Sequence, residues 1–235
     1  MYLQPKLIFG CLILVLCFSC TEKLSTENKA EGVITYDVTF PFNQDDILVN
    51  VFPTEMIIEF DETHMHASLE SRGGIIANEF IVDNATHELN QLLRSFNDRY
   101  AMHLDDQGVK NMLTIMPEMR LTPTDRTDTL AGYLCHITIA EFTTDSVPAI
   151  ELWHTGELDI KNPNWWNQFF LCDQILLGYE VEQYGMRMKL RAKKVELKEV
   201  NDDNFNMPAG YESVDYEGMD GKIKALLEQY TSNDR

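Results

Sequence analysis

Apolar and polar side chains alternate along much of the chain after residue 31, and this pattern predicts β-strands. Ile34, Tyr36, Val38 and Phe40 are apolar at every second position, which is the period of a strand with one buried face. Further short apolar segments follow at 56–60, 65–69, 75–77, 80–82, 89–93, 100–104, 112–116, 133–142, 150–155, 181–184 and 186–197. Polar turn residues separate them, so we expect an antiparallel sheet whose strands follow one another along the chain.

The middle of the chain carries a predicted hairpin and a predicted loop. Segments 89–93 and 100–104 form the hairpin, although Glu88 to Arg94 would fit a turn of helix equally well. We place a turn at Asp105 to Gly108, where the hairpin closes, and a polar loop at Thr122 to Thr129.

One aromatic stretch has the spacing of a helix. Asn162-Pro163 has the form of a cap followed by a first-turn proline, which predicts a helix over 162–170. Its aromatic residues would form two i,i+4 pairs, Trp165/Phe169 and Trp166/Phe170, and so one wide apolar face. Such a face either covers a hydrophobic cavity or packs on the sheet as ordinary core.

The first residues have the three-part layout of an export signal. Lys6 supplies a positive start, Leu7 to Phe18 are 12 uncharged, largely apolar residues, and Ser19-Cys20 follows. Twelve residues suit a signal peptide and are too few to cross a bilayer as a helix.

The placement of Cys20 resembles the lipobox of bacterial lipoproteins, in which a small residue precedes a cysteine that is diacylated, freed by cleavage and acylated again. Cys17 stands where that family prefers leucine. The resemblance implies that Cys20 carries the lipid and that several acyl chains hold the protein on a membrane. The alternative is an ordinary secretory signal in which Cys20 has no special role.

These patterns divide the chain into four parts. Residues 1–19 are the predicted signal peptide and 20–31 a flexible tether. Residues 32–211 form a single β-sheet domain, and 212–235 a C-terminal segment. That segment contains a predicted amphipathic helix whose apolar face consists of Met219, Ile223, Leu226, Leu227 and Tyr230.

The chain is strongly acidic. Without residues 1–19, whose only charged side chain is Lys6, 38 acidic and 18 basic residues remain. Such a charge repels phosphates, so we expect no nucleic-acid partner and take the acidity as a contribution to solubility.

Two cysteines remain besides Cys20, namely Cys135 and Cys172. In an oxidising compartment they could form a disulfide, which would stabilise the fold by ~3–4 kcal/mol in the chain-entropy model. The alternative is two buried thiols on separate elements.

The sequence carries fragments of metal-binding and catalytic motifs, but none of these motifs is complete. His64 and His66 share one face of a strand, but that face carries only these two ligands and looks solvent-facing. His87-Glu88 begins a zinc-protease motif, yet Gln91 stands in place of the second histidine. We also find no nucleophile elbow and no phosphate-binding glycine loop. We therefore expect no enzyme, no catalytic residue, no metal and no cofactor.

Four segments resemble the lipoproteins of unknown function that share the half-barrel fold of the Lol lipoprotein carriers. They are Gly32 to Tyr36, Leu130 to Cys135, Glu151 to Thr155 and Met207 to Tyr211. The resemblance implies a mainly β fold, a strongly curved antiparallel sheet, or half-barrel, with a few covering helices. Several relatives hold lipids in the concave face, and the family offers no catalytic residues.

We therefore expect a lipid-anchored protein of the bacterial cell envelope, at the outer membrane, that binds a lipid or another apolar ligand. The candidate ligand-binding residues are Trp165, Trp166, Phe169, Phe170, Met186 and Met188. The alternative is a structural or interaction lipoprotein whose core is filled by its own side chains.

Overall fold

The structure is a computed structural model that describes residues 31–41, 52–143 and 148–231. The predicted signal peptide, Cys20 and all of the predicted tether except its last residue lie outside the described residues.

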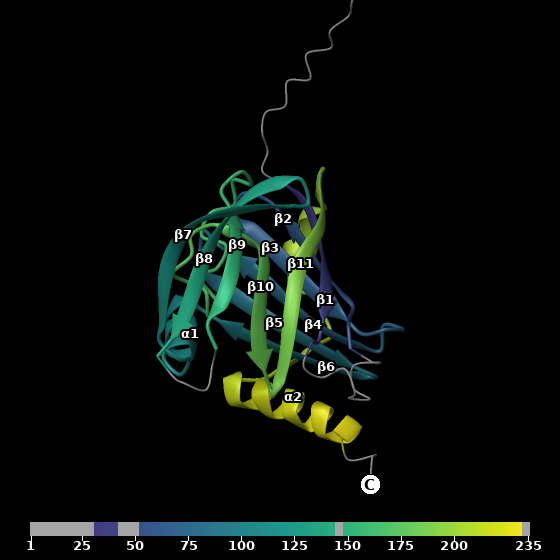
Figure 1. The fold of residues 1–235 in the computed structure, drawn as a ribbon. Coiled ribbons are helices and arrows are strands. Elements are labelled where there is room, and N and C mark those ends of the chain that lie inside the picture. The colour runs from purple at the N-terminus through teal and green to yellow at the C-terminus, as the bar shows by residue number, and fades with distance from the viewer. Residues whose placement is uncertain (1–30, 42–51, 144–147, 232–235) are drawn as a thin grey trace, which may run out of the picture.

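Twelve strands of the described residues form one sheet that curves strongly around its inner face (Figure 1). Its order is β12-β6-β5-β4-β3-β2-β1-β11-β10-β9-β8-β7, and all neighbours are antiparallel except β12 and β6. The strands are β1 (Gly32–Thr39), β2 (Glu55–Phe60), β3 (His64–Glu70), β4 (Ile76–Asp83), β5 (Glu88–Ser95), β6 (Asp98–Leu104), β7 (Met119–Leu130), β8 (Tyr133–Phe142), β9 (Ile150–Thr155), β10 (Ile175–Gln183), β11 (Met186–Leu197) and β12 (Glu212–Ser213). The predicted fold class, a mainly β curved sheet with a few helices, is confirmed.

The alternation seen in the sequence sets the two faces of the sheet. In β1, Ile34, Tyr36 and Val38 are buried on the concave face, while Asp37 and Thr39 are exposed on the convex face. The Tyr36 hydroxyl donates to the Leu176 carbonyl at 2.8 Å, so this buried phenol is satisfied. Burial raises the pKa of Tyr36 well above its usual value, which keeps it neutral.

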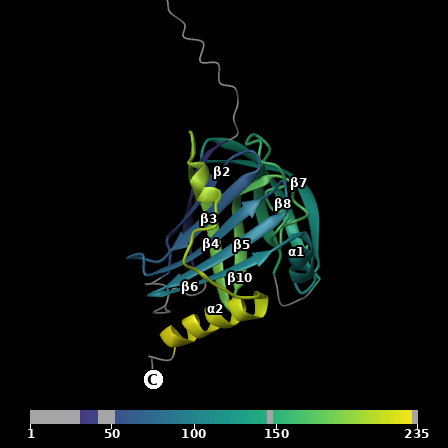
Figure 2. The same ribbon diagram turned by 180° about the vertical axis from the view of Figure 1, so that it is seen from behind.

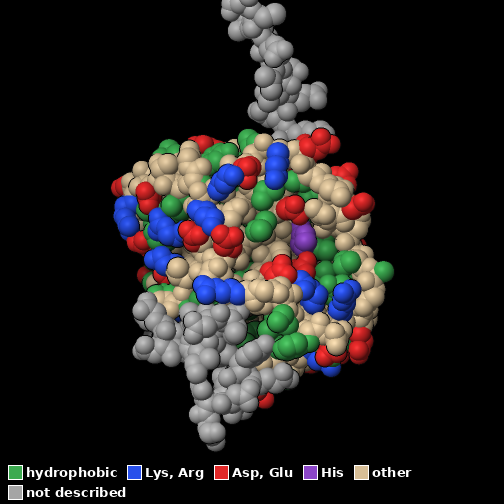
Figure 3. Space-filling view, turned by 90° about the vertical axis from the view of Figure 1, so that its right-hand side faces the viewer, with side chains coloured by type: hydrophobic (Ala, Val, Ile, Leu, Met, Phe, Trp, Pro, Cys, Tyr) green, Lys and Arg blue, Asp and Glu red, His purple; other side chains and the backbone are tan. Residues whose placement is uncertain are grey.

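The convex face carries paired charges. Lys193 contacts both Asp37 and Glu55 from neighbouring strands, and Arg187 contacts Glu180 at 2.6 Å. Figure 3 shows Lys and Arg side chains interspersed with Asp and Glu on one face of the molecule. The acidic balance of the chain is thus carried on a mixed surface, as expected for solubility.

Strand β7 folds back across the convex face and reaches β11. Arg191 of β11 donates to Asp128 of β7 at 3.2 Å and lies over the Trp153 ring at 4.7 Å from its centroid. Gly178 lies beneath, where an added Cβ would meet Leu130 at 3.0 Å and Trp153 at 3.1 Å. A side chain there would separate the layers, which explains the glycine in a strand interior.

Helix α2 (Tyr216–Thr231) confirms the predicted C-terminal helix. It crosses one end of the sheet, beside strands β5 and β6 (Figure 1). Met219 and Leu226 are buried against Leu93 and Met102 on the concave face. β12 precedes the helix and pairs with β6, so the segment after residue 211 continues the sheet. No helix among the described residues has the length and hydropathy needed to span a bilayer.

The chain between β11 and β12 runs over the convex face of β3 and β4 (Figure 2). A short 3-10 helix, η2 (Asp202–Phe205), holds it there. Phe205 stacks on His64 with 5.4 Å between ring centroids, and Asn204 donates to Glu59 at 2.8 Å. This segment therefore covers part of the convex side of β2 and β3.

The predicted helix over 162–170 is wrong, because these residues form consecutive turns. A helix cap needs an extended backbone, whereas Asn162 has φ of 45°, in the left-handed region. The buried Asn164 side chain donates to the carbonyls of Cys172 and Gln174, both at 2.8 Å. These bonds close the segment into a compact loop, called here the aromatic loop (residues 162–171).

Three other local predictions are wrong in the middle of the chain. The expected turn at Asp105 to Gly108 and strand at 112–116 are helix α1 (Asp106–Leu113) and the turn after it, with the Asp105 side chain accepting from Gly108 N–H at 2.8 Å. The hairpin of β5 and β6 closes earlier, at Phe96. The expected loop at 122–129 belongs to β7, whose residues are mostly exposed and so carry no alternation.

Candidate functional site

An apolar cavity of about 220 Å³ lies between the concave face of the sheet and the elements that cover it. Its floor consists of inward-facing side chains from neighbouring strands. Met56, Met65 and Ala67 come from β2 and β3, Tyr179 from β10 and Met188 from β11. Because consecutive strands contribute alternate residues, the cavity follows directly from the curvature and the period of the sheet.

The aromatic loop covers one side of the cavity. Trp166 packs on Phe80 of β4 with 5.1 Å between ring centroids, and Phe169 meets Tyr179 edge-on at 5.5 Å. Trp165 extends further and donates its indole N–H to Asn84 at 3.0 Å. The loop thus bridges the two arms of the curved sheet, which are far apart in the sequence.

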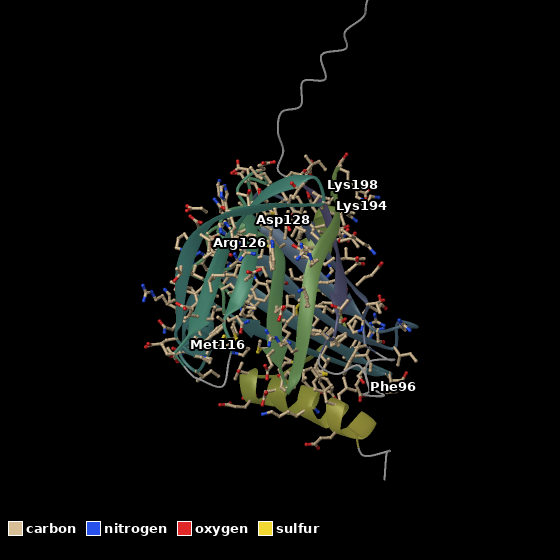
Figure 4. The ribbon with its side chains drawn as sticks, in the orientation of Figure 1. Phe96, Met116, Arg126, Asp128, Lys194 and Lys198 are labelled. Atoms are coloured by element: carbon tan, nitrogen blue, oxygen red, sulfur yellow. The ribbon has the colours of Figure 1, made fainter. Side chains whose placement is uncertain are left out.

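The helical side of the cavity lies at the end of the sheet near α2. Tyr216 and Ile223 of α2 line it, together with Tyr184 from the turn between β10 and β11 and Met116 after α1. Figure 4 labels Met116 at this end of the molecule. Tyr184 is 40% exposed, so the cavity reaches the surface here. Burial, together with the nearby Asp220 carboxylate of α2, raises the pKa of the Tyr184 hydroxyl, so this turn lies beside α2.

The polar groups in the lining are neutral amides and phenols. Gln91 of β5 donates to Asn78 of β4 at 2.9 Å, and both side chains line the cavity. In the described part of the chain, the Tyr179 hydroxyl bonds only the sulfur of Met56, at 3.9 Å, and thioether sulfur is a weak acceptor. Burial raises the pKa of Tyr179 far above its usual value, so it stays a donor.

The structure separates the six predicted ligand-binding residues. Trp166, Phe169 and Met188 line the cavity. Trp165 and Phe170 line a second depression of about 490 Å³ beside α1, formed by only eight residues, where Phe170 is 46% exposed. Met186 lines neither of the two.

Three lining residues that matter for polarity, Asn78, Gln91 and Tyr179, were not among the predicted ones. Asn78 falls in the gap between the predicted segments 75–77 and 80–82, which the structure joins into β4. On its face of β5, Gln91 stands between Leu89 and Leu93. The sequence could have indicated both Asn78 and Gln91, because each is a polar residue at a position where the alternation of the strand predicts an inward-facing side chain.

The two cysteines are free thiols, which corrects the disulfide prediction in favour of its alternative. Cys135 is buried in the main core cluster and Cys172 in a separate cluster under β8 and β9. Burial raises the pKa of both thiols, so neither is activated as a nucleophile.

The histidines noted in the sequence pair with carboxylates on the convex face. His64 lies 2.9 Å from Asp61, and His66 lies 2.9 Å from Glu79. Within the described ranges, no group of three or more such side chains has the geometry to hold a metal ion. His87 stacks on Trp165 at 4.5 Å, outside the cavity.

Comparison with known proteins adds information on the fold only. No protein-family model and no curated protein matches the chain. Two crystal forms of PNGF-II are similar to it: the P21 form with a TM-score of 0.53 at 16% identity, covering 82% of this chain and 33% of that chain, and the C2 form with 0.50 at 17%, covering 82% and 32%.

The chain thus spans about a third of the length of the PNGF-II chains it matches. A β-barrel-like protein of a domain of unknown function (DUF1849) from Brucella abortus aligns with a TM-score of 0.34 at 8% identity, over 72% of this chain and 98% of that chain. At such identities the PNGF-II likeness concerns the curved β-sheet alone.

Proposed function

We propose that this protein is an exported, lipid-anchored binding protein of the bacterial cell envelope that holds an acyl chain or similar apolar ligand in its cavity. The supporting observation is the cavity of about 220 Å³, bounded by the concave face, the aromatic loop and α2. We propose no catalytic role, since the cavity lining offers phenols, amides and apolar side chains rather than an acid–base pair.

The size of the cavity sets the scale of the ligand. It exceeds the roughly 150 Å³ that accommodates a benzene ring in an engineered core, and lies below the ~300 Å³ at which drug-sized pockets begin. One acyl segment therefore suits it better than several. A chain that places eight methylenes inside would gain ~6 kcal/mol at ~0.8 kcal/mol each, which corresponds to a Kd on the order of tens of micromolar.

The binding step is tested with phenylnaphthylamine, an uncharged fluorescent probe, and with native mass spectrometry of the purified protein. Met188→Trp fills the cavity and is expected to abolish probe fluorescence. Lys189→Trp is the matched control, because it adds the same ring at the next residue of β11, whose side chain pairs with Glu180 on the convex face. Loss of binding in both variants, or none in the unchanged protein, would support the structural alternative with a ligand-free core.

The anchor is tested separately through Cys20. In the proposed protein, Cys20→Ser moves the chain from the membrane fraction to the soluble fraction, and the unchanged chain carries the additional mass of acyl groups. A chain that is soluble with an unmodified Cys20 would leave an ordinary secreted protein and remove the lipoprotein from the proposal.

A further inference from the structure

The inner surface of the cavity differs sharply from the outer surface of the protein. Among the described residues, no Asp, Glu, Lys, Arg or His belongs to its lining. The convex face and the exposed edges, by contrast, carry numerous ion pairs, such as those of Lys193 and Arg187. Among the described side chains, a molecule inside the cavity therefore meets phenols and amides as its polar partners.

An ionised ligand would be poorly compensated in this environment. Moving a carboxylate out of water without a cation or several strong donors costs many kilocalories per mole, and the group takes up a proton instead. The negative charge of the whole chain, −19, adds a further unfavourable field for an anion. A neutral headgroup suffers neither penalty.

The polar partners that do exist suit a neutral headgroup. With one Gln91 N–H bound to Asn78, the Gln91 carbonyl remains an acceptor and the Asn78 amide a donor, and both side chains face the cavity. The Tyr179 hydroxyl, whose present partner is a thioether, is a second donor across the concave face. An alcohol can both donate and accept here, and an ester or amide carbonyl can accept from either donor.

We infer that the cavity selects an uncharged lipid, an acyl chain ending in a hydroxyl, ester or amide group, over a free fatty acid. This inference rests on the proposed function and names the ligand class of the same site. Gln91, Asn78 and Tyr179 bind the headgroup, while Met56, Met65 and the aromatic loop enclose the chain.

The test compares decanol with decanoate, which share one chain length and differ in headgroup charge. Affinities are measured at pH 8 by displacement of phenylnaphthylamine. Decanol is expected to bind at least ~tenfold more tightly than decanoate, because a tenfold loss of affinity corresponds to a penalty of about one pK unit for burying the ionised headgroup. Decanoate should bind more tightly as the pH falls toward 5. Equal or tighter binding of decanoate at pH 8 would overturn the inference and leave the proposed function intact. Failure of every ligand, the probe included, would overturn both.

Variants separate headgroup recognition from apolar enclosure. Gln91→Leu and Tyr179→Phe are expected to weaken decanol several-fold while leaving decane unchanged. Asn90→Leu is the matched control, because Asn90 lies next to Gln91 on the opposite face and bonds His103 at 3.0 Å. Gln168→Lys, at a half-buried lining position, should raise decanoate affinity selectively. Thermal melting confirms that each variant is folded, and an unchanged ligand preference in all three lining variants would contradict the inference.

Discussion

Filling the cavity with one larger side chain distinguishes a usable void from a tightly packed interior. Ala67 lies on the concave side of β3, is only 4% exposed and lines the cavity. Ala67→Leu adds three carbon atoms. If the cavity accepts them without strain, they gain about 2 kcal/mol at ~0.8 kcal/mol for each buried carbon.

The opposite sign is expected wherever side chains already fill the space, since overpacking a core costs ~1–3 kcal/mol. Ala140 supplies that comparison, because it is 0% exposed in the cluster under β8 and β9 and does not line the cavity. Ala140→Leu should therefore destabilise the protein while Ala67→Leu stabilises it, a difference of roughly 3–5 kcal/mol.

The free energy of unfolding of both variants is measured by urea denaturation. A shift of the urea midpoint reports a change in stability as long as the slope of the free energy against urea concentration stays the same. Ala67→Leu should also weaken phenylnaphthylamine binding, because the added side chain occupies ligand volume. A destabilised Ala67→Leu, similar in size to Ala140→Leu, would show that the interior is filled and would refute the reasoning from cavity volume.

Three further predictions address packing, pH and thiol chemistry. Gly178→Ala should lower stability by ~1–3 kcal/mol in urea unfolding, because its Cβ would lie within about 3 Å of neighbouring side-chain carbons; a neutral effect would mean that β7 is not held against the sheet there. The hydrogen bond from His66 lowers the pKa of Glu79 below 4.5 in the folded protein. The ionised Glu79 side chain therefore stabilises the fold fully above pH 4.5, and this stabilisation is lost as the pH falls through the lowered pKa of the folded state. Glu79→Gln should thus reduce the acid-dependent loss of stability measured between pH 6 and about 3, and an unchanged pH profile would contradict this. Cys135 and Cys172 should react with a thiol reagent only after unfolding, and reduction should leave the mass unchanged; rapid labelling of the native protein would count against their burial.

The parts of the fold that the sequence predicts well are the strands with one buried face. In β1 and β11, side chains alternate between the concave core and the convex surface, and the period of two is visible in the sequence. The alternation is missing from β7, because its residues 122–129 lie at the open edge of the sheet and are largely exposed on both sides. The position of a strand at the edge of a sheet is set by the tertiary fold, so the local pattern of apolar and polar residues does not predict it.

The aromatic loop shows why the candidate site was predicted only in part. The spacing of Trp165, Trp166, Phe169 and Phe170 favours a helix, and only the bonds of Asn164 to distant carbonyls reveal a loop. In the loop, Trp166 and Phe169 still turn inward, while their neighbours face α1. Composition therefore identified the right segment, whereas the direction of each ring depends on contacts with β4 and β10 that the sequence does not contain.

The position of the first described residue has a consequence for the direction in which ligands move. Glu31 accepts a hydrogen bond from Lys198 N–H at 3.3 Å, and Lys198 lies at the far end of the molecule from α2 (Figure 4). If the protein is anchored as proposed, the tether joins the domain at the end opposite Tyr184 and α2, so the opening of the cavity stays free to meet a soluble partner or a facing bilayer. On vesicles that carry the anchored protein, headgroup-attached quenchers should quench a fluorophore at position 198 more strongly than one at position 224; the reverse pattern would rule out this arrangement.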